Sequence, residues 1–294
     1  MNATVSEGAN WTLVNGDSCE QLPTLAADSV DLSVYSPPFS SLFTYSATER
    51  DIGNCSTHEE FLAHLGFVIR ELFRVTKPGR LSCCHIAQLP SSKAMHGVIG
   101  LIDLRGAMIQ AFAAEGWIYH GEVCIDKDPQ AQAIRTHAKG LLFVQLRKDS
   151  SWMRPALADY ILLFRKPGEN AAPIIPDVSN EEWIEFARPI WYGIRESDTL
   201  NAAVARENDD ERHICPLQLG TIERCIRLWS NPGDLVLSPF AGIGSEGYEA
   251  VRLGRRYWGC ELKPSYAKVA ARNLQQAETL KTQGGLFDGE KVGA

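Results

Sequence analysis

The chain has 294 residues, of which 45% are hydrophobic and 22% charged, and its 29 Lys and Arg against 36 Asp and Glu give a formal net charge of −7. This composition is that of a globular protein with one large domain or two small ones. The negative charge argues against a protein that coats nucleic acid non-specifically, although it leaves room for a local basic face. No apolar run reaches the roughly 18 residues that a membrane span needs.

The eight cysteines include no C-x-x-C pair, and the N-terminal residues 1–6 do not resemble a signal peptide. We therefore expect reduced thiols in a cytoplasmic protein, with neither a disulfide framework nor a metal site.

Short apolar runs alternate with amphipathic stretches along most of the chain, which predicts alternating strands and helices. In chain order, strands are predicted at 11–14, 31–35, 81–87, 117–125, 159–164, 235–237 and 256–260, and helices at 57–77, 103–115, 219–229 and 245–252. Pro78 and Gly79 are expected to end the first helix. Because the strands are apolar on both faces, we predict an α/β, Rossmann-like fold with a mostly parallel twisted sheet and helices on both sides.

The predicted site is built around Ser36-Pro37-Pro38-Phe39, which follows the strand at 31–35. Pro37 lacks a backbone donor and Pro38 fixes φ, so the strand must open into a rigid turn there. The Ser36 hydroxyl and a proline carbonyl suit the two N–H hydrogens of a planar NH₂ group, and the Phe39 ring suits its flat face. An isolated Ser-Pro-Pro-Phe is more often only a turn, so this interpretation depends on the rest of the chain.

Three further segments lack regular periodicity or carry excess charge. Residues 40–56 form a long aperiodic loop after the turn, with Phe43 and Tyr45 in it, and such loops are often functional. From 126 to 166, eight Lys and Arg accompany four Asp and Glu. This is the candidate polyanion-facing surface, although such clusters are often only solvated faces. Periodicity also fades over residues 169–212, which we predict to be an insertion tethered at both ends to the α/β core.

A Gly-rich loop lies near the C-terminus, where Gly242, Gly244 and Gly247 form G-x-G-x-x-G between a predicted strand and helix. Glu261 ends the next strand, where a carboxylate can bind ribose hydroxyls. A nicotinamide-dinucleotide domain is the competing interpretation, but in such a domain this unit comes first, and here 33 residues follow Glu261. We therefore expect the N-terminal half to complete the sheet, with the Gly-rich loop and the Ser36 turn at the same edge.

Together these motifs resemble, in their order, the permuted DNA amino-methyltransferases, in which the catalytic motif precedes the cofactor motif. The Ser36–Phe39 turn resembles their [DNS]-P-P-[YFW] motif, and 240–245 resembles their F-x-G-x-G-[ST] loop for S-adenosylmethionine. Asn15-Gly16-Asp17 resembles the segment whose acid meets the cofactor adenine, and 213–217 the segment before the cofactor helix. Ser238 departs from the pattern, because many relatives carry Asp before Pro-Phe.

The resemblance implies a division of the chain and a set of roles. Residues 11–168 would be the catalytic half of the domain, 169–212 the target-recognition insertion, 213–275 the cofactor half and 276–294 a flexible tail. The implied catalytic residues are Ser36, Pro37, Pro38 and Phe39. The implied cofactor residues are Asp17, Ser36, Cys215, Pro216, Leu217, Phe240, Ala241, Gly242, Gly244, Ser245 and Glu261. Gly244 is expected to lie where the backbone approaches the cofactor.

Double-stranded DNA is the implied partner, in a bacterial or phage-type cytoplasm. The candidate DNA-binding residues are Phe43, Tyr45, Lys127, Arg135, Lys139, Arg147, Lys148, Arg154, Arg188, Arg195 and Arg206. For the last three, pairing with nearby Glu and Asp is the alternative. The resemblance also suggests a homodimer, for which the sequence locates no interface.

The chemistry limits the target atom without fixing the base. Methylation at cytosine C5 needs a thiolate in a Pro-Cys turn, whereas this chain has Cys215-Pro216, the reverse order, and Cys83-Cys84 inside an apolar strand. An exocyclic amine is therefore predicted, as adenine N6 or cytosine N4, since a serine hydroxyl serves both. A methyltransferase acting on RNA or a protein amide, and an inactive nucleic-acid-binding relative, remain the alternatives.

Overall fold

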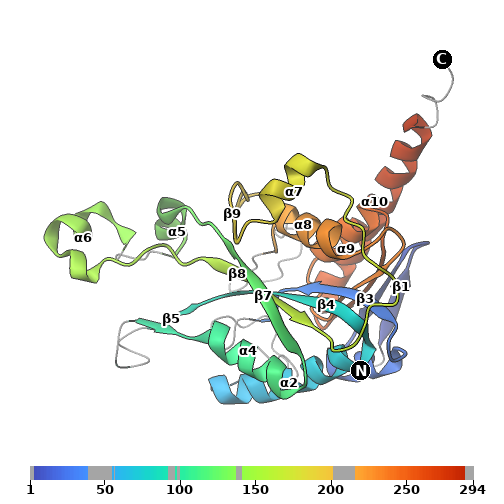
Figure 1. The fold of residues 1–294 in the computed structure, drawn as a ribbon, viewed down its shortest axis with the longest axis horizontal. Coiled ribbons are helices and arrows are strands. Elements are labelled where there is room, and N and C mark those ends of the chain that lie inside the picture. The colour runs from blue at the N-terminus through green and yellow to red at the C-terminus, as the bar shows by residue number, and fades with distance from the viewer. Residues whose placement is uncertain are drawn as a thin grey trace.

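The computed structural model describes residues 3–38, 55, 57–91, 97, 100–136, 141–200 and 216–288. In this part of the chain the centre of the molecule is a nine-stranded sheet with the order β1-β2-β11-β10-β3-β4-β8-β7-β9 (Figure 1). Its strands are β1 (Thr4–Glu7), β2 (Trp11–Asn15), β3 (Val30–Tyr35), β4 (Thr76–Ala87), β7 (Ile118–Ile125), β8 (Asp159–Arg165), β9 (Ile190–Trp191), β10 (Leu235–Ser238) and β11 (Arg256–Glu261). A separate hairpin pairs β5 (Leu89–Ser91) with β6 (Gly100–Ile102).

Five neighbouring strands, β2, β11, β10, β3 and β4, are parallel. At the two ends the sheet is mixed, because β1 is antiparallel to β2 and β8 is antiparallel to both β4 and β7. The predicted mostly parallel α/β sheet is thus confirmed. Strands from both ends of the chain interleave, since β10 lies between β11 and β3 with Val236 opposite Leu32.

Helices cover both faces of the sheet, as predicted (Figure 1). The helical segments are α1 (Ser18–Gln21), the 3-10 turn η1 (Leu22–Thr24), α2 (His58–Val75), α4 (Leu104–Ala114), α5 (Pro129–Thr136), α6 (Phe143–Lys148), the 3-10 turn η5 (Ser150–Trp152), α7 (Asn180–Phe186), α8 (Leu219–Trp229), α9 (Ser245–Arg252) and α10 (Pro264–Asp288). One core lies under α8, α9 and α10, and the other under α2 and α4. The side chains of β3 contribute to both cores, since Leu32 and Val34 lie in the first core and Tyr35 lies in the second.

Helix α2 shows how the sequence builds one of these layers. The Thr57 hydroxyl accepts a hydrogen bond from the Glu60 N–H and caps the helix. Phe61, Leu65 and Leu72 are then fully buried along one face, and burial of such side chains stabilises the fold by about 1.5–3 kcal/mol each. The helix ends at Val75, so the expectation that Pro78-Gly79 ends it is wrong: those residues lie inside β4, which starts at Thr76.

Two other boundaries differ from the prediction. Helix α10 continues to Asp288, beyond residue 276, at which the predicted tail begins. Within the predicted insertion, α7 and β9 pack onto the main body, because Trp191 is fully buried and its ring stacks on that of Trp229 at 6.2 Å. Periodicity could not reveal this, since isolated contacts hold the segment, such as the Trp191 ring and the pairing of the two-residue strand β9 with β7.

The segment that projects from the sheet lies between β7 and β8 and contains α5 and α6, on the left of Figure 1. We call residues 129–157 the appendage. Gln132 closes its base, because its side chain donates to the Leu157 carbonyl and accepts from the Leu157 N–H at 2.8 Å.

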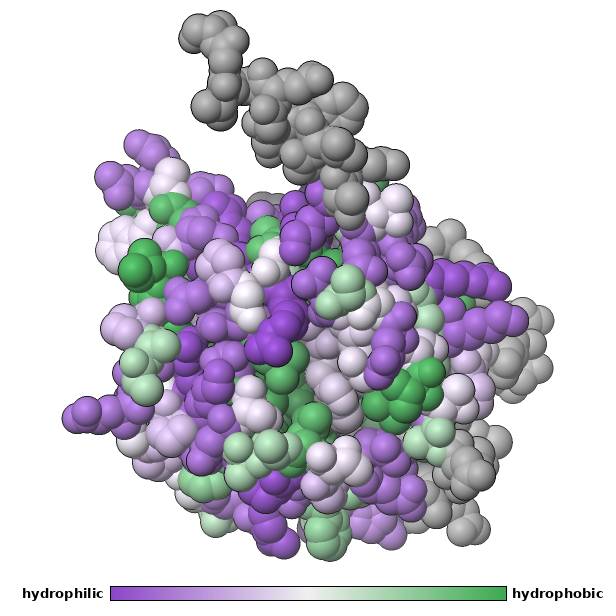
Figure 2. All heavy atoms as spheres, turned by 90° about the vertical axis from the view of Figure 1, so that its right-hand side faces the viewer, coloured by the Kyte–Doolittle hydropathy of each residue, from purple (hydrophilic) through white to green (hydrophobic). Residues whose placement is uncertain are grey.

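The surface seen in Figure 2 is largely hydrophilic, with apolar residues in small groups. Among the described residues no helix is long and apolar enough to cross a bilayer.

Candidate active site

The Ser36 turn lies where β3 leaves the sheet, between the ends of β10 and β4. All six residues of β3 are buried, so the strand fixes the turn from below. Ser36 is half-buried and Pro37 is buried. The Ser36 hydroxyl lies 3.1 Å from His85 Nδ1 and 3.4 Å from the His85 carbonyl oxygen. Phe39, the fourth residue of the motif, lies outside the described residues.

The Gly-rich loop leaves the adjacent strand β10, and hydrogen bonds tie it to β11 and to the start of α1. The Ala241 N–H donates to the Cys260 carbonyl at 2.8 Å, and the Ser18 hydroxyl donates to the Pro239 carbonyl. Phe240 is half-buried, with its ring centroid 6.1 Å from that of Tyr35 in β3. The loop and the Ser36 turn therefore share one edge of the sheet, as the sequence predicted.

Two glycines of this loop adopt left-handed backbone but face different surroundings. Gly242 has φ +52°, and a Cβ placed on it would meet no heavy atom within 4 Å. Gly244 has φ +85°, and its Cβ would lie 3.1 Å from Ala270 Cβ and 3.2 Å from Ala270 Cα. Gly242 thus borders open space, whereas Gly244 lets the start of α9 approach α10. The side-chain position of Gly244 points to that helix, and its predicted contact with the cofactor stays a prediction.

The two predicted carboxylates lie at the ends of β2 and β11, which are neighbours on the same side of β10. Asp17 caps α1 by accepting a hydrogen bond from the Cys19 N–H at 2.9 Å. Glu261 accepts from the Gly242 N–H and from the Lys263 N–H, both at 2.8 Å. Both acids therefore hold local backbone, and Glu261 fixes the shape of the Gly-rich loop directly. Pro216 and Leu217 precede α8, with Leu217 buried in the core.

A buried polar network that the sequence did not predict adjoins the Ser36 turn. His85 in β4 places Nε2 3.2 Å from the Asp159 carboxylate at the start of β8, and Lys127 Nζ lies 2.6 Å from the same oxygen. Burial raises the pKa of Asp159, but the hydrogen bonds and charges of His85 and Lys127 outweigh it and hold that pKa below its usual value. The only local signal in the sequence was a histidine inside an apolar strand, because β8, which carries Asp159, neighbours β4 in the sheet but not along the chain.

A second buried acid, Glu246, lies in the first turn of α9 behind the Gly-rich loop. Burial raises its pKa to about 8, with a further contribution from the charge of Glu261. This carboxyl group is therefore largely protonated at neutral pH. The sequence prediction missed it because a Glu in the first turn of a helix is ordinarily an exposed, favourable charge.

The candidate DNA-binding residues separate into four groups, the last of which lies in the 169–212 segment. Lys127 is buried and ion-paired, so its predicted place on an exposed basic surface is wrong. Arg147 and Lys148 are exposed on α6 of the appendage, and Arg154 is half-buried near its base. Outside the described residues lie Phe43, Tyr45, Lys139 and Arg206, and so does the side chain of Arg135 in α5. Cys215, one of the candidate cofactor residues, also lies outside them.

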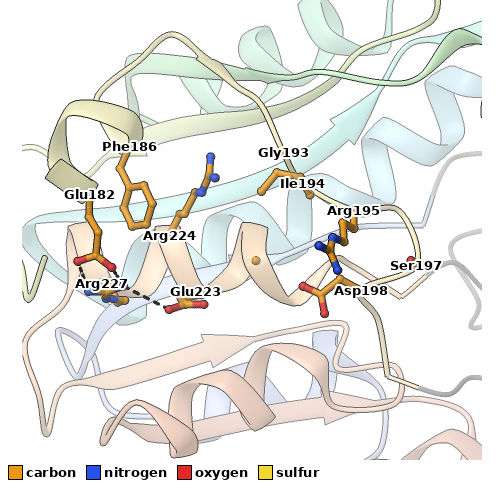
Figure 3. A pocket seen from close by; sticks show the side chains of 11 residues that line it. Glu182, Phe186, Gly193, Ile194, Arg195, Ser197, Asp198, Glu223, Arg224 and Arg227 are labelled. Carbon is orange, nitrogen blue, oxygen red and sulfur yellow. Dashed lines mark hydrogen bonds and ion pairs between the residues drawn. The ribbon is translucent and has the colours of Figure 1, made fainter.

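The two remaining arginines lie in the 169–212 segment. Arg188 pairs with Glu185 at 3.1 Å, which favours the alternative of pairing with a nearby acid. Arg195 borders a cavity of about 590 Å³ between α7, residues 193–198 and α8 (Figure 3). Across this cavity Arg227 is held by Glu182 at 2.8 Å and Glu223 at 3.3 Å. Neither the Ser36 turn nor the Gly-rich loop lines the cavity, so it is separate from the strand-end site.

Comparison with known proteins agrees with this geometry. Type II methyltransferase M1.MboII of Moraxella bovis is 26% identical over 265 residues, which cover 85% of this chain and 91% of that protein. M.BglI of Bacillus subtilis is 28% identical over 176 residues, which cover 59% of this chain but only 44% of that protein.

Two solved structures share the fold. TTHA0409 of Thermus thermophilus, solved with S-adenosyl-L-methionine, has a TM-score of 0.66 at 26% identity, and the match covers 89% of this chain and 92% of that one. The cytosine-N4-specific PvuII DNA methyltransferase has a TM-score of 0.64 at 18% identity, covers 94% and 92%, and shows the fold alone. The family model described as DNA methylase, of the N6/N4 class, matches residues 30–272. Because this match spans most of the chain, the protein belongs to the N6/N4 family of DNA methylases.

Proposed function

We propose that this protein transfers a methyl group from S-adenosylmethionine to an exocyclic amino nitrogen of a base turned out of duplex DNA. The observation that carries the proposal is the shared edge of β3 and β10, which places the Ser36 turn beside the Gly-rich loop. An amine acceptor and a methyl donor must meet within about 3–3.5 Å, and neighbouring strand ends in an open α/β sheet bring two ligands that close.

The residues at this edge fit the cofactor. The space beside Gly242 admits a ligand close to the backbone, and Asp17 and Glu261 offer carboxylates after the neighbouring strands β2 and β11 for adenine and ribose. When bound, S-adenosylmethionine supplies an electrophilic methyl group on a sulfonium. Contacts to it are proposed from Asp17, Pro216, Leu217, Phe240, Ala241, Gly242, Ser245 and Glu261. Gly244 would act indirectly by letting α9 and α10 pack closely.

The Ser36 turn would prepare the nucleophile. The lone pair of an aromatic NH₂ group is delocalised into the ring, which makes the nitrogen a poor nucleophile. Hydrogen bonds from its two N–H groups to Ser36 Oγ and the Pro37 carbonyl favour a pyramidal nitrogen and expose the lone pair. Phe39 is proposed to stack on the base after it leaves the helix.

The appendage is proposed to contact the duplex. It joins the C-terminal end of β7 to the start of β8, and Asp159 at that start lies opposite Ala87 at the end of β4. The base of the appendage therefore adjoins the edge that carries the Ser36 turn. On α6, at the end of the appendage away from the sheet (Figure 1), Arg147 and Lys148 are exposed and Phe143 is 80% exposed. This combination of cations and aromatic surface suits nucleic acid. Arg195 remains a candidate base reader in the 169–212 segment.

The target base follows less directly. Ser36 in the first motif position favours cytosine N4 within the family, whereas Asp or Asn is associated with adenine N6. The preference is weak on physical grounds, because both bases present the same C–NH₂ geometry to a hydroxyl. We therefore propose the exocyclic amine without choosing between the two bases.

The test is to incubate the protein with radiolabelled S-adenosylmethionine and, in parallel, with unmethylated bacterial DNA, RNA or a cell extract. Label in DNA, identified by nucleoside mass spectrometry as N6-methyladenine or N4-methylcytosine, is the expected result. Label only in RNA or protein, 5-methylcytosine, or no methylated product would overturn the proposal. A second arm replaces both Arg147 and Lys148 with Ala. We expect weaker binding to all DNA sequences and a shallower salt dependence, by about two charges.

A further inference from the structure

The structure assigns a role to His85: we propose that it is a positioning residue whose Nδ1 accepts a hydrogen bond from the Ser36 hydroxyl. Ser36 Oγ would then present both lone pairs to the target amine. This inference rests on the proposed function of the Ser36 turn. It concerns three residues from different parts of the chain that meet beside that turn, His85, Asp159 and Lys127.

Ser36, His85, Asp159 and Lys127 form a chain of polar contacts. His85 Nδ1 lies 3.1 Å from Ser36 Oγ, and Nε2 on the other side of the ring lies 3.2 Å from Asp159 Oδ2. Lys127 Nζ approaches the same carboxylate oxygen at 2.6 Å, and only 2% of the Lys127 side chain is exposed. His85 itself is 7% exposed. The imidazole is thus held between two partners in a site largely closed to water.

The order of donors and acceptors follows from these partners. An ionised carboxylate can only accept hydrogen bonds, and the buried Lys127 ammonium favours the ionised form of Asp159. The proton of a neutral imidazole therefore belongs on Nε2, facing Asp159, which leaves a lone pair on Nδ1. That lone pair can only accept, and the Ser36 hydroxyl, at 3.1 Å, is a donor beside it.

The contact with His85 sets the direction of the hydrogen bond that Ser36 makes with the target amine. A serine hydroxyl with a freely rotating hydrogen can either donate to the base or accept from its amine, and only acceptance assists the nitrogen. A hydrogen held toward His85 removes the wrong choice before the base arrives, which is preorganisation of the kind that raises turnover. The His85 carbonyl oxygen, at 3.4 Å from Ser36 Oγ, offers a weaker second acceptor that any substitution at this position would retain. We therefore expect substitution of His85 to lower the methylation rate without abolishing it.

The competing explanation is that the network only satisfies buried polar groups. Two substitutions separate these roles, because they put an amide oxygen at different places. His85→Asn can place an acceptor near the position of Nδ1, whereas His85→Gln places it near Nε2, away from Ser36. A merely structural network would tolerate the two about equally.

Single-turnover methylation of DNA at saturating cofactor measures the step concerned. We expect His85→Gln to lower the rate at least tenfold, with little change in the affinity for S-adenosylmethionine or DNA, and His85→Asn to recover most of that loss. Asp159→Asn should lower the rate similarly, because an amide can donate to Nε2 and favour the wrong tautomer. In a Ser36→Ala background, His85→Gln should cause no further loss, since the hydroxyl it orients is gone.

Equal rates for His85→Gln and wild type, or equal multiplicative losses with and without the Ser36 hydroxyl, would overturn the inference and leave the proposed function standing. Wild-type protein that methylates no DNA would instead overturn the proposed function, and this inference with it. Thermal unfolding of each variant shows whether a rate change reflects lost folding. Should the Gln variant not fold, the comparison of His85→Asn with wild type in both Ser36 backgrounds decides the question.

Discussion

Replacing Gly242 and Gly244 separately by Ala should affect two different properties, although the glycines are two residues apart. Both have left-handed backbone, which costs an L-residue about 1–2 kcal/mol. At Gly242 the added methyl group meets nothing within 4 Å, so this strain is the whole cost to folding. At Gly244 the methyl group would lie 3.1 Å from Ala270 Cβ, and overpacking of this kind adds about 1–3 kcal/mol.

These free energies translate into distinct melting temperatures. At an unfolding entropy of about 2.1 cal/mol/K per residue, 1 kcal/mol corresponds to roughly 1.6 °C for a chain of this length. Gly242→Ala should therefore lower Tm by about 2–3 °C, and Gly244→Ala by about 3–8 °C. Cofactor affinity should change in the opposite order, because the methyl group of Gly242→Ala enters the open space beside the loop. We expect at least a tenfold weaker Kd there and less than a threefold change at Gly244.

Differential scanning fluorimetry measures the two Tm values, and titration calorimetry with S-adenosylmethionine, well below Tm, measures the two affinities. The variants serve as controls for each other, since each carries the same methyl group on the same type of backbone. The reasoning would be refuted if Gly244→Ala abolished binding at unchanged Tm while Gly242→Ala bound normally. That outcome would mean that Gly244, and not Gly242, borders the cofactor.

Three further changes test other parts of the structure. Ser36→Ala should lower turnover by roughly 10²-fold and leave cofactor Kd nearly unchanged, since the hydrogen bond serves the amine; a parallel loss of cofactor binding in calorimetry would contradict this. Glu246 has a pKa of about 8 in the folded protein against 4.5 ordinarily, so the folded state binds more protons and stability falls as pH rises between these values. Glu246→Gln should remove that part of the Tm decline, whereas the exposed Glu59→Gln should not, and identical pH profiles of both variants would argue against a buried acid. The Arg80 side chain is 2% exposed and lies 3.0 Å from Asp234. Arg80→Met should lower the free energy of unfolding, measured with urea, by about 3–5 kcal/mol, and a decrease below about 1 kcal/mol would show that this charge is not needed.

The sequence predicted most of the strands that carry the site, because its signals there are local. Pro37 ends a strand, and the glycines of 242–247 mark a strand-to-helix turn, whatever surrounds them. The directions of β8 and β1 were not predictable in this way, since an apolar strand has the same sequence pattern in parallel and in antiparallel pairing.

The sequence failed where a property arises only between distant residues. His85, Lys127 and Asp159 come from three separate segments, and no spacing along the chain relates them. Lys127 was predicted to face DNA because a lysine in a basic segment is ordinarily solvated, and its burial depends on an acid 32 residues later. Which glycine borders open space likewise depended on where α10 lies, which the loop sequence does not encode.

The place of β10 between β11 and β3 also has a consequence for how the protein is made. Strands β2 and β3 leave the ribosome early, yet their sheet partners β11 and β10 begin only at Arg256 and Leu235. During synthesis both early strands therefore have unpaired edges, which are prone to pairing with other chains. Pairing across roughly 200 residues is slow, so the central strands should be the last part of the sheet to form. Two fragments divided in the 169–212 segment would each lack a complete sheet, and methylase activity should depend on both being present together.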